Sequence, residues 1–98
     1  MYVLALHVEL RFPSSHSLKE KRMLLKPIVD GLRTRFEVSV AEVARQDSWQ
    51  RCELGVALVS GDVGSIEKAA DQVERFVWQA ADTEVLRIDR EWMDLDQS

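Results

Sequence analysis

The chain has 98 residues, of which 46% are hydrophobic and 31% are charged, values typical of a single soluble globular domain. No apolar run reaches the roughly 18 residues that cross a bilayer, and the first residues lack a signal-peptide pattern. We therefore exclude a disordered or fibrous chain and expect a cytoplasmic protein with no membrane partner. The formal net charge of −4 hides an asymmetry, because residues 17–36 carry a balance of +4 and the rest carries −8. One basic face is expected, without a general affinity for polyanions.

Cysteine and histidine are scarce. The single Cys52 cannot form an internal disulfide, and its place in an alternating apolar run predicts a buried, inert thiol. The two histidines, His7 and His16, show no zinc-binding spacing, so we expect no metal and no cofactor. The chain has nine arginines, four lysines and no asparagine, and this scarcity of heat-labile amides favours a thermophilic source.

The first half of the chain predicts a strand, a turn and a helix. Apolar residues alternate from 2 to 12, which indicates a long strand with one buried face. Pro13 and the serines after it predict a turn, and a helix follows from Ser17 with an apolar face that extends to Phe36. Pro27 lies inside this helix and removes a backbone hydrogen bond. We expect either a kink or two short helices meeting near residues 23–27.

The second half predicts two more strands, a helix and a final strand, over residues 38–44, 52–58, about 66–80 and 83–92. The apolar alternation slips around Ala41, which predicts a bulge, and the acidic tail from Asp94 is expected to fray. The order of elements predicts one ferredoxin-like α+β domain over residues 1–98. Its sheet is expected to be four-stranded and antiparallel, with the first and third strands central and both helices on one face.

Cations crowd the predicted start of the first helix. Ser17 followed by Glu20 matches a capping box, which marks a helix N-terminus. Lys19, Lys21 and Arg22 then lie where the helix dipole disfavours positive charge. A basic stripe is predicted along this helix, formed by Lys19, Arg22, Lys26 and Arg33. The stripe indicates a site for a phosphate-bearing or acidic partner; the competing interpretation is a solvated edge whose cations lay their stems along the apolar face.

An exposed tryptophan is predicted at the connection between the second and third strands. Trp49 lies between Arg45 and Arg51, and an indole between two guanidinium groups can hold a nucleobase or phosphate. The alternative is that Trp49 folds over the sheet edge and protects it. The predicted anion or RNA site therefore comprises Lys19, Lys21, Arg22, Lys26, Arg33, Arg45, Trp49 and Arg51.

The sheet face away from the helices is predicted to be small and apolar at one end. It presents no aromatic residue from the central strands, so base stacking of the kind used by RNA-recognition modules is not expected there. A flat patch of this composition suits a second copy of the chain, although a solvated sheet face is the alternative. The predicted oligomer interface comprises Val3, Ala5, His7, Gly55 and Ala57.

Catalytic signals are weak. The only group with a nucleophile near a base is Ser14, Ser15, His16 and Ser17 in the first turn, and isolated turn histidines are usually solvated. We expect no catalytic residues and no small-molecule substrate.

Three strings, SLKEKR at 17–22, VSVAEV at 38–43 and QDSWQRCELGVALVS at 46–60, together resemble the YlxP-like family of small uncharacterised bacterial proteins. The resemblance implies a ferredoxin-like fold and a cytoplasmic protein. The family's genes commonly lie near genes for translation initiation and ribosome maturation, which implies an RNA or ribosome context. The sequence therefore predicts a non-enzymatic binding module for structured RNA or a ribonucleoprotein, with a protein-interaction or homo-oligomeric role as the alternative.

Overall fold

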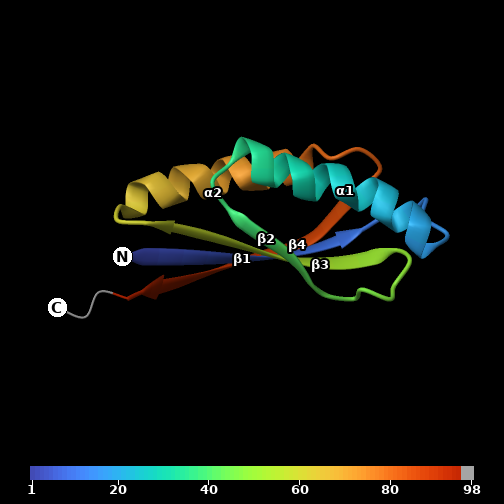
Figure 1. Cartoon of the computed structure of the whole chain (residues 1–98), viewed down its shortest axis with the longest axis horizontal. Coiled ribbons are helices and arrows are strands. Elements are labelled where there is room, and N and C mark those ends of the chain that lie inside the picture. The colour runs from blue at the N-terminus through green and yellow to red at the C-terminus, as the bar shows by residue number, and fades with distance from the viewer. Residues whose placement is uncertain (96–98) are drawn as a thin grey trace.

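The computed structural model describes residues 1–95 and has one antiparallel sheet covered on one face by two helices (Figure 1). The strand order is β2-β3-β1-β4, so the first and third strands are central, as predicted. The elements are β1 (Tyr2–Arg11), α1 (Leu18–Arg35), β2 (Ser39–Ala44), β3 (Arg51–Ser60), α2 (Val63–Trp78) and β4 (Glu84–Asp94). The ferredoxin-like α+β fold is confirmed.

The core lies between the sheet and the helices. Successive residues of a strand point to opposite faces. The even-numbered residues from Leu4 to Leu10 in β1 and from Cys52 to Leu58 in β3 face the helices and are buried, with Leu4, Val8 and Leu54 fully so. The helices cover them with apolar residues that recur at helical spacing: Leu25, Ile28, Leu32, Ile66, Ala70, Val73 and Val77. The odd-numbered residues of β1 and β3 form the opposite face, which we call the open face.

Helix α1 is uninterrupted from Leu18 to Arg35 although Pro27 lies inside it, so the expected division into two short helices is wrong. A proline costs a helix one hydrogen bond and crowds the carbonyl four residues earlier. Here both Pro27 and Met23 are on the exposed side, where water can hydrogen-bond the freed carbonyl. The core-facing side of the helix keeps its packing.

Two irregularities adjust the outer strands. In β2 the register against β3 shifts between Glu42 and Ala44, close to the predicted bulge. In β4 a second shift lies opposite Glu9 and Leu10. β4 includes Asp94, and the N–H of Leu95 donates to the carbonyl of Met1, so the sheet extends into the segment that was predicted to fray. Residues 96–98 of that tail lie outside the described residues.

Within residues 1–95, neither helix combines the length and the apolar character that crossing a bilayer requires.

Candidate nucleic-acid interface

One end of the molecule brings together the β1–α1 turn, the start of α1 and the β2–β3 connection, and Figure 1 shows them side by side. Backbone and side-chain hydrogen bonds join the turn to the connection. The N–H of Phe12 donates to the carbonyl of Gln50 over 2.7 Å. Nε2 of Gln50 donates in return to the carbonyls of Pro13 and Ser15, each over 3.1 Å. We call this part of the molecule the hairpin end.

The predicted capping box is present, with one difference. Oγ of Ser17 accepts a hydrogen bond from the N–H of Glu20 over 3.0 Å. The Glu20 carboxylate accepts from the N–H of His16, one residue before the cap, rather than from Ser17 itself. The cap fixes where α1 begins, and with it the positions of Lys19 and Arg22 in the first turns.

The prediction that Lys21 belongs to an accessible basic surface is wrong. Its side chain is buried, and only 2% of the residue is exposed. Nζ donates to the carbonyl of Arg45 over 2.7 Å and lies 2.9 Å from Oε2 of Glu42. The contact with Glu42 is an ion pair without the alignment of a hydrogen bond. Lys21 shares the core-facing side of α1 with Leu25, at the spacing of one helical turn. Its ammonium is therefore unavailable to an external anion.

The ion pair of Lys21 and Glu42 borders the buried Cys52. Burial raises the pKa of the Cys52 thiol to about 12, and the Glu42 carboxylate adds to the increase. The thiol is therefore protonated and weakly reactive at neutral pH, as the sequence predicted.

Three further cations of the predicted site are engaged within the chain. Lys26 forms an ion pair with Asp30, one turn later on α1. Exposed ion pairs of this kind contribute little to the stability of the fold. Nη2 of Arg33 donates to the carbonyl of Val40 over 2.8 Å. Nε of Arg45 lies 3.0 Å from Oε2 of Glu53. The predicted stripe along α1 is thus interrupted.

The remaining predicted residues lie at the hairpin end and are accessible. Lys19 and Arg22 are exposed, Arg51 is half-buried, and none of the three makes an ion pair or side-chain hydrogen bond with any residue from 1 to 95. Trp49 is 57% exposed, so more than half of its surface is open to an external partner. The structure therefore leaves three cations and one indole for an external partner.

The predicted interface residues share the open face. The register of β1 against β3 pairs Val3 with Val59, Ala5 with Ala57, and His7 with Gly55. Val59 is 63% exposed, and a second apolar side chain, Val43 of β2, is 52% exposed.

His7 departs from this apolar pattern. Its Nε2 donates to Oε1 of Glu53 over 2.7 Å. Burial alone would raise the pKa of the Glu53 carboxyl, but hydrogen bonds from Arg45 and His7 outweigh that effect and hold the pKa below its usual value.

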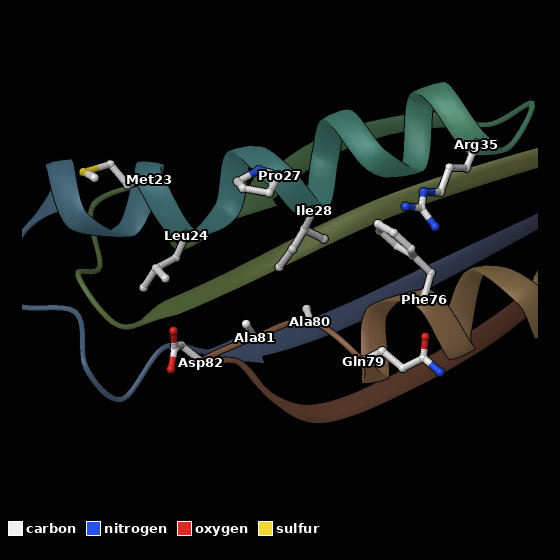
Figure 2. A pocket seen from close by; sticks show the side chains of 10 residues that line it. All are labelled: Met23, Leu24, Pro27, Ile28, Arg35, Phe76, Gln79, Ala80, Ala81 and Asp82. Carbon is white, nitrogen blue, oxygen red and sulfur yellow. The ribbon is translucent and has the colours of Figure 1, made fainter.

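A groove between the helices was not expected from the sequence. The helices meet where Gly31 of α1 contacts the ring of Phe76, and Arg35 lies over the same ring at 5.1 Å from its centre. Beyond this contact, side chains of both helices and of the α2–β4 connection enclose about 350 Å³ (Figure 2). Leu24 and Ile28 supply apolar lining. The volume of this groove is at the small end of the range for ligand pockets. The sequence offers little to predict the groove beyond Gly31, a small residue that lets the ring of Phe76 approach α1.

Comparison with known proteins gives a family match over most of the chain. A family described as "Protein of unknown function (DUF503)" matches residues 3–90. The protein named "Uncharacterized protein YlxP" from Bacillus subtilis (strain 168) is 43% identical over 61 residues, which cover 62% of this chain and 66% of that protein.

Proposed function

The chain belongs to the DUF503 family, and we propose that it is a non-enzymatic module that binds structured RNA through its hairpin end. The observation that carries the proposal is that Lys19 and Arg22 of α1, Trp49 of the β2–β3 connection and Arg51 on the open-face side of β3 are accessible at this end of the molecule, and that the three cations have no side-chain partner among residues 1–95. Cations supply the sequence-independent attraction to phosphates, and an exposed indole can stack on an unpaired base. Loops and bulges of folded RNA present both kinds of group.

The rigidity of the hairpin end supports the proposal. The connection that bears Trp49 is joined to the β1–α1 turn through Gln50 and to α1 through the buried Lys21. The cations of α1 therefore keep a defined position relative to the indole, which reduces the entropy lost on binding. The translation context implied by the family resemblance is in keeping with an RNA partner.

The test is fluorescence anisotropy with a labelled RNA hairpin and a single-stranded RNA of the same length. We expect the hairpin to bind more tightly, with a slope of log affinity against log salt of roughly −2 to −3 for three phosphate contacts. Lys19→Ala with Arg22→Ala should weaken binding and reduce the slope by about 2. Trp49→Ala should weaken binding and leave the slope nearly unchanged.

The matched control is Lys68→Ala with Arg75→Ala, which removes the same charge from the exposed side of α2. We expect its affinity to change much less than that of the α1 variant. Equal losses in the two double variants would contradict the proposal, as would binding that does not depend on salt.

The exposed Val43 and Val59 favour a second candidate function, self-association through the open face. The face is flat there, because Ala5 and Ala57 are cross-strand neighbours, and two such faces can pack as the layers of a sandwich do. Ala57→Asp should then convert a dimer into a monomer in sedimentation equilibrium, whereas Lys19→Ala should not. A wild-type chain that remains monomeric at high concentration would exclude this candidate.

A further inference from the structure

The open face carries a group of potential metal ligands that the sequence did not predict. His7 and Glu9 are two residues apart on β1 and therefore point to the same face. Glu53 of β3 is the direct cross-strand neighbour of Glu9. One potential ligand atom from each of the three residues lies within 4.8 Å of the others. Rigid central strands of the sheet supply all three side chains.

The charge of Glu9 is not balanced by any residue from 1 to 95, although that of Glu53 is paired with Arg45. Glu9 and Glu53 are like charges placed directly opposite each other, which destabilises a sheet. The cross-strand neighbour of Glu9 on the other side is Arg87, but Nε of Arg87 lies 2.7 Å from Oδ2 of Asp89 instead. Among residues 1–95, Glu9 makes no side-chain hydrogen bond or ion pair. Glu53 has Arg45 and His7 as partners, whereas the half-buried Glu9 carboxylate faces Glu53 with no cation of its own among these residues, and a bound cation would explain this arrangement.

The donor set suits a divalent transition metal. It contains one imidazole nitrogen and two carboxylates, a combination that binds Zn²⁺ and other first-row ions and leaves a position for water. Ligand atoms in a tetrahedral zinc site are about 3.3 Å apart. Nε2 of His7 and Oε1 of Glu53 are now 2.7 Å apart, so a small outward movement would admit an ion.

The surroundings of Glu53 and His7 also fit such a site. Oε2 of Glu53 is held by Arg45, which leaves Oε1 directed toward His7, and partners of this kind orient metal-ligating carboxylates. A hollow of about 370 Å³ next to His7, bordered by Ala5 and Gly55, gives water and small donors access to the imidazole.

We propose that His7, Glu9 and Glu53 form a binding site for one divalent first-row metal ion on the open face. The proposal is independent of RNA binding, because none of these residues belongs to the group of cations and indole at the hairpin end. It also gives Glu9 a role that the predicted apolar interface did not include.

The experiment is isothermal titration calorimetry of the full chain with ZnCl₂ at neutral pH, paired with thermal unfolding in the presence and absence of Zn²⁺. The wild-type chain should bind one ion per chain, and its Tm should rise because the ion binds the folded state. Glu9→Gln should weaken binding at least about tenfold, as the loss of a charged ligand does. It should also maintain or raise the Tm of the metal-free protein, because the like-charge pair is removed.

Two control variants distinguish this site from scattered surface groups. Glu67→Gln changes an exposed carboxylate of α2, away from the open face, and His16→Gln removes the other histidine. Both should bind Zn²⁺ as the wild type does. The proposal is overturned if the wild type shows no saturable binding, if Glu9→Gln binds as tightly as the wild type, or if His16→Gln abolishes the signal.

Discussion

Replacement of Lys21 by methionine tests whether the buried ammonium is a structural element of the hairpin end. Methionine keeps most of the apolar stem and removes the charge. The carbonyl of Arg45 loses the Lys21 hydrogen bond but retains one from the N–H of Ser48 over 3.0 Å. Glu42 is affected more, because its Oε2 has no other partner among the described residues and its side chain is only 24% exposed.

The expected loss of stability follows from the burial of the pair. Removal of one member of a fully buried ion pair costs about 3 to 5 kcal/mol, because the other charge stays buried without compensation. Glu42 reaches water in part, so we expect Lys21→Met to lower the free energy of unfolding by about 2 to 4 kcal/mol. In a domain of this size, that corresponds to a decrease in Tm of roughly 8 to 25 °C.

Urea unfolding followed by circular dichroism gives the free energy directly. Glu42→Gln in the Lys21→Met background removes the uncompensated charge, so the double variant should recover much of the lost stability, and the cycle of four proteins isolates the pair. A loss below about 1 kcal/mol, the range of exposed ion pairs, would refute the reasoning. Because Lys21→Met is expected to perturb the fold, it is unsuitable for measuring RNA affinity, unlike Lys19→Ala and Arg22→Ala.

Two further predictions concern the helices. Gly31→Ala would place a Cβ 2.3 Å from Cζ of Phe76; urea unfolding should show a loss of about 1 to 3 kcal/mol from overpacking, and Phe76→Leu in the same chain should reduce that loss. At the start of α2, hydrogen bonds from Ser65 hold the pKa of Asp62 below its usual 3.8. The unfolded chain therefore binds this proton more readily than the folded one, and stability should fall as the pH drops below about 3.8. In the variant Asp62→Asn, urea unfolding measured across acid pH should show a smaller loss of stability, because residue 62 no longer takes up a proton. If stability depends on acid pH in the same way in the variant and the wild type, Asp62 is not the source of the effect.

The sheet and helices were predictable because their signals lie between near neighbours in sequence. The period of two in β1 requires one buried face, and the order of elements with right-handed crossovers then leaves few topologies. The capping box at Ser17 marked the start of α1 for the same reason. The effect of Pro27 was harder to predict, since its cost depends on whether the freed carbonyl reaches water, and that depends on which side of α1 faces the sheet.

The candidate sites were predictable only in part. Trp49 was correctly placed as exposed, because it lies in a polar connection between two strands. Lys21 was wrongly placed on the surface, although the sequence held a signal: Glu42 occupied an inward-facing position where the strand pattern slipped. A carboxylate on the buried face of a strand needs a cation as its partner. Lys21 lies one helical turn before the apolar Leu25, on the side of α1 that was expected to face the core, and could have been identified as that cation.

The sequence by itself determined the elements, their order and the apolar faces, since these depend on patterns within a few residues of the chain. Only the tertiary structure decided which charges remain free and which carboxylates meet. Lys21 pairs with a residue 21 positions away, and His7 meets Glu53 across 46 positions. Such pairs are set by strand register and by the placement of a helix on the sheet, and electrostatic interactions act through space without leaving a periodic trace in the sequence.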